Sequence, residues 1–147
     1  MKKFLAGFCA AAIAAGCMGM TVMADTEATD KLTSYEATSD NVKLIGRTYR
    51  KGDTTILGYS ASGIEFKCTG TKAVFNVNGS VGEARIGVFV NGKLVKQGYI
   101  KNKKTNAVEV DLPEGESTVK LIKLSEAAQS VIAIDSFEVD GKPQPTE

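Results

Sequence analysis

The stretch Ala84–Ile100, ARIGVFVNGKLVKQGYI, decides the fold class. Asn91 and Gly92 stand between two runs rich in apolar residues, and this pair supplies the two positive-φ positions of a type I′ turn. Side chains alternate between the two faces of a strand, so the first run has one apolar face. That face consists of Ile86, Val88 and Val90. The pattern predicts an antiparallel β-hairpin.

Short runs of the same kind extend in both directions from this hairpin, between Asn41 and Gly141. They are rich in Val, Ile, Phe and Tyr and are separated by Gly, Asn and Asp. Eight or nine such strands with regular turns predict an all-β sandwich or barrel. The last run, SVIAIDSFEVDG, is apolar enough to be a central strand. The preceding segment SEAAQS is expected to form either a single helical turn capped by Ser125 or a loop.

The first 24 residues have the features of a signal peptide. Lys2 and Lys3 precede the apolar run FLAGFCAAAIAAGCMGM, and VMA ends with small residues that a signal peptidase reads. Cleavage is expected before Asp25. The alternative is a lipoprotein signal, because AAGC ending at Cys17 is a loose lipobox. Both alternatives predict an exported protein, either secreted or anchored by lipid at Cys17.

The composition of the remaining chain divides it into three segments. Residues 25–40 are polar, with little to bury, and are interpreted as a flexible lead-in. Residues 41–141 are expected to form the β-sandwich domain. Residues 142–147, KPQPTE, are expected to be a linker or tail. No transmembrane segment is expected after signal cleavage.

Composition excludes several classes of function. The 147 residues contain no histidine and no tryptophan, and the net charge is +1. Without histidine, the chain has no Ser-His-Asp or Cys-His machinery and no imidazole metal site. The only basic cluster is KNKK, at Lys101–Lys104, which is too small to favour a nucleic-acid partner. No catalytic, metal or cofactor residue is therefore predicted, although hydrolysis by paired carboxylates stays formally open.

Cys68 would be the only cysteine left after signal cleavage, so no internal disulfide is expected. It lies in the run GIEFKCTG, where the neighbouring Lys67 should point to the opposite face of the strand. We therefore interpret Cys68 as a buried apolar side chain and not as a reactive thiol.

Four residues are candidates for ligand contact: Arg47, Tyr49, Tyr59 and Tyr99. Exposed tyrosines can stack on sugar rings, and an arginine can hold an acidic ligand or an acidic neighbouring domain. The alternative is that each tyrosine is a partly buried strand residue and that Arg47 is solvated or ion-paired. Ser60, in GYSASG, does not match the nucleophile-elbow motif Gly-x-Ser-x-Gly, because its glycines are spaced differently.

Four segments together resemble a known family. NVKLIGRTY, YSASGIEFKCTGTKAVF, ARIGVFVNGK and VKLIKLSEAAQSVIAIDSFEVDGK follow in the order and spacing of the N-terminal domain of family-two carbohydrate esterases. SGIEFKCTGTKA and IKLSEAAQS carry the resemblance best, and it covers about Asn41 to Lys142. Members of this family are secreted deacetylases of plant polysaccharides such as acetylated xylan and glucomannan.

The resemblance implies a jelly-roll β-sandwich followed, after a short connection, by an SGNH-type hydrolase domain. The family's catalytic serine, in a Gly-Asp-Ser motif, and its histidine belong to that second domain. No position in this sequence matches them, so no catalytic residue is carried over. The partner that the resemblance implies is the hydrolase domain, together with plant cell-wall polysaccharide.

Two functions are compatible with these observations. The first is a non-catalytic half of a polysaccharide deacetylase, which predicts an exposed apolar patch on one sheet. The second is a free-standing carbohydrate- or protein-binding module, which predicts a polar exterior and a groove with two or three coplanar tyrosines.

Overall fold

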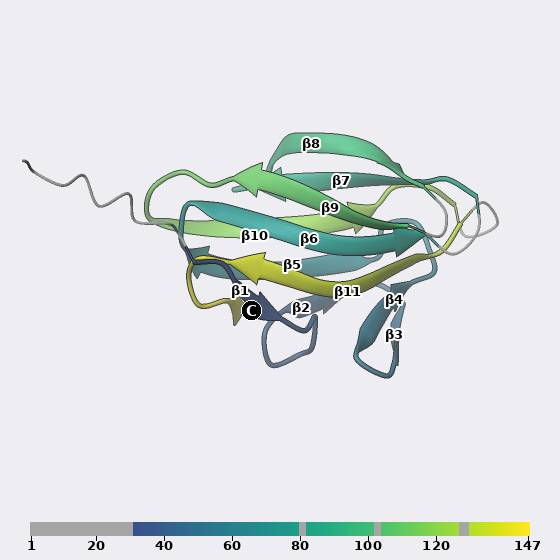
Figure 1. Ribbon diagram of the computed structural model, residues 1–147, viewed down its shortest axis with the longest axis horizontal. Coiled ribbons are helices and arrows are strands. Elements are labelled where there is room, and N and C mark those ends of the chain that lie inside the picture. Colours follow the sequence, from purple (N-terminus) through teal and green to yellow (C-terminus); the bar gives the residue numbers. More distant parts are fainter. Residues whose placement is uncertain (1–30, 80–81, 102–103, 127–129) are drawn as a thin grey trace, which may run out of the picture.

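The structure is a computed structural model that describes residues 31–79, 82–101, 104–126 and 130–147. The expected signal peptide and Cys17 lie outside the described residues. So do residues 25–30 of the lead-in and residues 127–129 of SEAAQS. Within the described part, the chain forms twelve β-strands in two six-stranded sheets that pack face to face (Figure 1).

The first sheet, here called sheet A, has the order β3-β4-β11-β6-β9, and β1 also pairs with β11. Its strands are β1 (Thr33–Tyr35), β3 (Thr48–Lys51), β4 (Thr54–Leu57), β6 (Lys72–Gly79), β9 (Thr105–Asp111) and β11 (Ile132–Val139). Sheet B has the order β12-β5-β10-β7-β8, and β2 also pairs with β5. Its strands are β2 (Lys43–Ile45), β5 (Gly63–Thr69), β7 (Ala84–Val90), β8 (Lys93–Ile100), β10 (Glu116–Lys123) and β12 (Gln144–Pro145).

The hairpin at Asn91-Gly92 is confirmed. Both residues have positive φ, 50° at Asn91 and 78° at Gly92, as a type I′ turn requires. The Asn91 side-chain oxygen also accepts a hydrogen bond of 2.9 Å from the backbone N–H of Thr118 in β10. The turn is therefore fastened to the next strand of sheet B.

The core lies between the two sheets and contains the inward side chains of nearly every strand. Its centre is a group of fully buried aromatic rings from both sheets, Phe66, Phe75 and Phe137. The rings of Phe66 and Phe137 stack at 4.6 Å between centroids. Burial of a side chain of this size stabilises the fold by about 1.5–3 kcal/mol. Phe137 lies in β11, which is central in sheet A as predicted.

The run NVKLIGRTY contributes to two strands in different sheets. β2 pairs with β5 in sheet B, and β3 pairs with β4 in sheet A. Gly46 lies between them with φ of 67°, a left-handed conformation that redirects the chain from one sheet to the other. Splits of this kind and three-residue strands raise the strand number above the expected eight or nine.

Residues 31–40 differ from the flexible lead-in that the sequence suggested. β1 pairs with the end of β11, along Phe137–Val139, which β4 does not cover. The ring of Tyr35 stacks on Phe137 at 5.8 Å, and Ala37 is fully buried. A free strand edge and two apolar side chains therefore tie this polar segment to sheet A.

The segment 142–147 is also part of the sandwich and is not only a tail. Gln144 and Pro145 form β12, which pairs with Lys67 and Phe66 of β5. The Thr146 hydroxyl donates a 2.7 Å hydrogen bond to the Glu65 carboxylate. A proline is compatible with this place because β12 is an edge strand.

Candidate functional site

The four predicted ligand-contact residues lie on three different surfaces. Tyr49, in β3, and Tyr99, in β8, are 59% and 61% exposed, and they belong to different sheets. Tyr59, 51% exposed, follows β4 in a turn at one end of the sandwich. Among the residues described, the tyrosines therefore do not form a shared platform. The structure brings together only Arg47 and Tyr59.

The Arg47 guanidinium lies over the Tyr59 ring, with 5.3 Å between its central carbon and the ring centroid. This cation–π contact depends on two tight turns that pack against each other. Gly46 is so close to the second turn that a Cβ there would lie 3.2 Å from Cα of Ser62. Ala61, in the second turn, has a left-handed φ of 61°, which is uncommon for a residue with a side chain.

The second turn is joined to the end of β10. The backbone N–H of Ala61 donates to the carbonyl of Lys123 at 2.9 Å, and the N–H of Lys123 donates to the carbonyl of Ser62 at 2.9 Å. The Ser60 hydroxyl lies 3.3 and 3.4 Å from the two carboxylate oxygens of Glu126. The two sequence segments that carry the family resemblance best, SGIEFKCTGTKA and IKLSEAAQS, therefore begin side by side.

Lys123, the last residue of β10, is fully buried next to the turn that carries Ser60 and Ala61. Its ammonium donates to the carbonyl oxygens of Ser125 at 2.6 Å and Glu126 at 3.1 Å. Burial lowers the pKa of Lys123, and the carboxylate of Glu126 opposes part of that effect. The sequence analysis did not single out Lys123, although its place after Val119 and Leu121 on the inward face of β10 was a usable signal.

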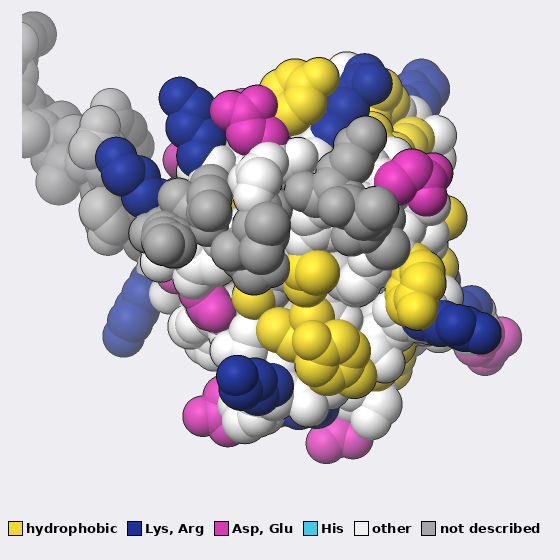
Figure 2. Space-filling view, turned by 90° about the vertical axis from the view of Figure 1, so that its right-hand side faces the viewer, with side chains coloured by type: hydrophobic (Ala, Val, Ile, Leu, Met, Phe, Trp, Pro, Cys, Tyr) yellow, Lys and Arg dark blue, Asp and Glu magenta, His cyan; other side chains and the backbone are white. Residues whose placement is uncertain are grey.

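We call this group, made of Arg47, Tyr59, Ser60, Lys123 and Glu126, the loop-end cluster. In the end view of the sandwich, hydrophobic side chains lie below the centre and also along the top and the right edge, with acidic and basic side chains between them (Figure 2). The loop-end cluster offers an aromatic ring, a guanidinium, a hydroxyl and a carboxylate, which are groups that can bind a polar ligand.

The loop-end cluster lacks the parts of a hydrolytic site. Ser60 contacts a carboxylate, and no imidazole is present in the sequence to activate it. Burial, with a contribution from Asp140, raises the pKa of the Cys68 thiol to about 11. Cys68 is thus the buried side chain that the sequence predicted. No group of three or more potential metal ligands occurs in the described part of the chain.

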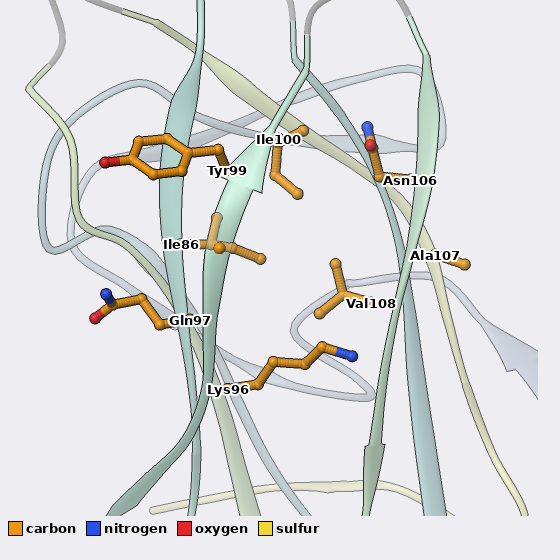
Figure 3. A pocket seen from close by; sticks show the side chains of 9 residues that line it. Ile86, Lys96, Gln97, Tyr99, Ile100, Asn106, Ala107 and Val108 are labelled. Carbon is orange, nitrogen blue, oxygen red and sulfur yellow. The ribbon is translucent and has the colours of Figure 1, made fainter.

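A hollow lies between the edge strands β8 and β9 (Figure 3). Its volume is about 180 Å³, and apolar side chains of Ile86, Ile100 and Val108 line it. The Lys96 ammonium spans it to reach the carbonyl of Glu109 at 2.7 Å. The Tyr99 side chain lies on the far side of β8, away from this hollow (Figure 3). The hollow is smaller than typical ligand pockets of 300–1,000 Å³.

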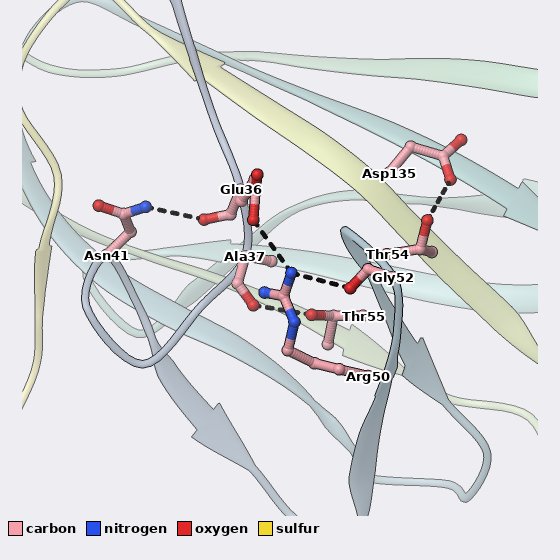
Figure 4. A network of polar contacts seen from close by, with 8 residues as sticks. All are labelled: Glu36, Ala37, Asn41, Arg50, Gly52, Thr54, Thr55 and Asp135. Atoms are coloured by element: carbon pink, nitrogen blue, oxygen red, sulfur yellow. Dashed lines mark hydrogen bonds and ion pairs between the residues drawn. The ribbon is translucent and has the colours of Figure 1, made fainter.

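A polar network fastens the N-terminal segment to sheet A (Figure 4). Arg50 forms a 3.0 Å ion pair with Glu36 and donates to the Gly52 carbonyl at 3.1 Å. The buried Thr55 hydroxyl donates to the Ala37 carbonyl at 2.7 Å. Arg50 is therefore occupied by internal partners and is not available to a ligand in this arrangement.

Residues 44–146 match the family of carbohydrate esterase 2 N-terminal domains. The chain belongs to this family. The match spans all of sheet A except β1 and nearly all of sheet B, so the family resemblance inferred from the four segments is confirmed. A search of curated proteins finds no match.

Solved structures show the same fold. A family-two carbohydrate esterase from Cellvibrio japonicus superposes with a TM-score of 0.67 at 19% identity, over 78% of this chain and 35% of that one. A family-two carbohydrate esterase from Clostridium thermocellum, in complex with cellohexaose, superposes with a TM-score of 0.66 at 23% identity, over 72% of this chain and 33% of that one. This N-terminal domain therefore spans about a third of the length of those esterases.

A carbohydrate-binding module of family CBM36, solved with calcium and xylotriose, gives a TM-score of 0.60 at 16% identity. The match covers 71% of this chain and 97% of that module. The expected jelly-roll-like antiparallel sandwich is thus shown. Within the described residues, no helix is long and apolar enough to span a membrane.

Proposed function

We propose that this chain is the non-catalytic N-terminal accessory domain of a secreted carbohydrate esterase, a polysaccharide O-deacetylase. Its family membership carries the proposal. In this role the domain packs against an SGNH-type hydrolase domain, which supplies the catalytic serine and histidine. The domain itself stabilises the hydrolase and helps to shape the cleft for the polysaccharide.

The chemistry of the chain supports a non-catalytic role. The sequence contains neither histidine nor a Gly-Asp-Ser motif. In the loop-end cluster, the Ser60 hydroxyl lies at the longer end of hydrogen-bond distances from the Glu126 carboxylate. A deacetylase needs an activated nucleophile and donors for the oxyanion, and the loop-end cluster offers no activating base.

Export is the second part of the proposal. The apolar N-terminal run and the VMA site support cleavage before Asp25 and release outside the cell. A polysaccharide deacetylase must reach the cell wall, so export agrees with the function. The alternative is a mature protein that begins at Cys17 with attached lipid. Mass spectrometry of the exported protein distinguishes these two N-termini.

The experiment that tests the non-catalytic role is an acetate-release assay with the purified chain on acetylated xylan and acetylated glucomannan. We expect no release above the buffer control. Turnover that disappears in Glu126→Gln, or in another single carboxylate variant, would contradict the proposal and revive the carboxylate mechanism.

A second candidate function is carbohydrate binding, and the loop-end cluster favours it. Tyr59 is half exposed and has Arg47 fixed against its ring, which is an arrangement that can stack on a sugar and hydrogen-bond to it. The fold of the CBM36 module supports the same idea. Titration with xylotriose and cellohexaose tests it. Binding should be lost in Tyr59→Ala and retained in Tyr49→Ala, whose tyrosine lies on another surface.

A further inference from the structure

The outer face of sheet B carries an apolar surface that nothing in the described structure covers. Strand alternation places one set of six residues on this face, from β2, β7, β8, β10 and the segment after β10. We call the set the apolar band. It consists of Ile45, Gly87, Phe89, Leu94, Ile122 and Leu124.

The band is continuous across the sheet. Ile45 and Ile122 both lie opposite Gly63 of β5, and Ile122 also lies opposite Gly87 of β7. Gly63 thus lies between the two isoleucines and Gly87 lies on the other side of Ile122, so neither position adds a side chain to this row. A Cβ at Gly87 would be 3.2 Å from side-chain carbons of Leu94, Phe89 and Leu124, so these three side chains converge on it.

Solvent reaches much of this surface. Leu94 is 50% exposed and Leu124 is 37% exposed, and Phe89 and Ile122 are partly exposed. Apolar surface of this kind gains free energy when another surface removes it from water. A contiguous apolar patch on a soluble domain usually marks an interface.

The rest of the outer surface is different. On sheet A, Asn76 donates to Ser136 at 3.0 Å and to Glu138 at 2.8 Å, and Asn78 donates to Asp135. Polar side chains there satisfy one another. Charged residues border the apolar band on sheet B: Lys120, which lies opposite Phe89, pairs with Glu65 at 2.6 Å, and Lys67 pairs with Glu116 at 3.5 Å.

The end of the chain lies at an edge of the same sheet. Thr146 is hydrogen-bonded to Glu65, and the Lys43 ammonium donates to the backbone oxygen of Glu147. Lys43 and Ile45 belong to the same short strand, β2, and the marked C-terminus lies beside it (Figure 1). A domain joined after Glu147 would start next to the apolar band.

Resting on the proposed function, we propose that the apolar band is the surface on which the hydrolase part of a family-two esterase packs. The matched region is 35% and 33% of two such esterases, so about two-thirds of each lies outside it and can supply the partner surface. That partner surface is apolar where it meets Phe89, Leu94 and Leu124, which converge on Gly87. At the border of the band it meets Lys120, which lies opposite Phe89 and is paired with Glu65. Packing on sheet B leaves the polar face of sheet A open to solvent.

The test uses the full chain, alone and extended after Glu147 by the hydrolase part of the Clostridium thermocellum enzyme. Amide hydrogen exchange is followed in both proteins, together with the thermal midpoint. Extension should slow exchange in β7, β8 and β10 but not in β3, β6 and β9. Leu94→Glu and Leu124→Glu should each abolish that slowing. The matched control, Ala107→Glu on the outer face of sheet A, should leave it intact.

Two controls keep the outcomes distinct. All three substituted side chains are exposed, so the midpoint of the unextended chain should hardly change. Should Leu94→Glu unfold the unextended chain, Leu94→Ser replaces it. Unchanged exchange on extension, slowing on sheet A, or equal behaviour of Leu94→Glu and Ala107→Glu would overturn the proposal. Acetate release by the unextended chain would instead contradict the non-catalytic function, whatever the exchange pattern.

Discussion

The Lys123 ammonium lies 2.6 Å from the carbonyl oxygen of Ser125, and no part of the lysine is exposed to solvent. A lysine is rarely buried unless its charge has partners. Here the partners are backbone carbonyls of the segment that follows β10. Ser60 is hydrogen-bonded to Glu126 in the same segment, and Ala61 to the carbonyl of Lys123 itself. Within the loop-end cluster, Lys123 is therefore the buried residue that fixes the segment carrying Glu126.

We expect Lys123→Met to lower the free energy of unfolding by about 1–3 kcal/mol, because two carbonyls lose their buried donor. Chemical denaturation at neutral pH measures this. Lys120→Met is the matched control: Lys120 lies three residues earlier, on the outer face, and pairs with Glu65 in a partly exposed ion pair. Its loss should cost no more than about 1 kcal/mol. Equal effects of the two substitutions would show that burial of Lys123 has no special role.

The lowered pKa of Lys123 leads to a prediction about how stability depends on pH. Its pKa in the folded chain is lowered by burial from the ordinary 10.5, so in the interval below 10.5 the unfolded chain binds more protons than the folded chain. The contribution of Lys123 to stability should therefore rise as the pH rises through that interval. Denaturation curves of wild type and Lys123→Met at several alkaline pH values test this. A difference that shrinks with rising pH would show that the pKa is raised instead.

Asp140 joins the end of β11 to the turn before β6. Its carboxylate accepts hydrogen bonds from the Thr71 backbone N–H at 2.8 and 3.0 Å, the Thr71 hydroxyl at 2.7 Å and the Lys72 N–H at 3.2 Å. Burial opposes ionisation, but these donors outweigh it and lower the pKa of Asp140 below 3.8.

The stability that ionised Asp140 contributes should be fully present above pH 3.8 and should be lost as the pH falls through the lower, folded-state pKa. At neutral pH, Asp140→Asn should cost about 1–3 kcal/mol, because hydrogen bonds to a charged acceptor are lost. Acid titrations of stability for the two proteins provide the test. Parallel titration curves would mean that Asp140 makes no contribution in this range.

Gly92 allows a prediction about the hairpin alone. Its φ is 78°, and a Cβ at this position would meet nothing within 4 Å. Gly92→Val should therefore destabilise the fold by about 1 kcal/mol or more through backbone strain only. Thermal denaturation measures the change. Gly98, which has room for a Cβ and no positive φ, serves as the control site. A neutral Gly92→Val would show that the turn tolerates other backbone conformations.

Cys68 should not react with thiol reagents while the chain is folded. It is almost completely buried, and its pKa of about 11 leaves very little thiolate at neutral pH. Labelling should become rapid in denaturant. Rapid labelling of the native protein would contradict the burial of this side chain in β5.

Much of the fold could be predicted from local sequence. The hairpin at Asn91-Gly92 and the central strand β11 follow from turn chemistry and apolar runs, which are short-range signals. β1 and β12 could not be predicted, because each depends on a free edge of a distant strand, β11 or β5. The change of sheet at Gly46 likewise depends on tertiary packing that periodicity does not encode.

The site was harder to predict than the fold. Exposure of Tyr49, Tyr59 and Tyr99 agrees with their selection as candidates, but their separation depends on which sheet each strand joins. The contact between Ser60 and Glu126 joins residues that are 66 positions apart. The apolar band likewise combines strands that are distant in sequence, so only the assembled sheet shows it.

The central claim, that this domain serves the hydrolase of a carbohydrate esterase, is tested most directly by sequencing the encoding DNA beyond codon 147. The claim predicts an open frame that continues into a Gly-Asp-Ser motif and a later histidine codon. A stop codon directly after Glu147, in clean and deep reads, would contradict it and would favour a free-standing binding module.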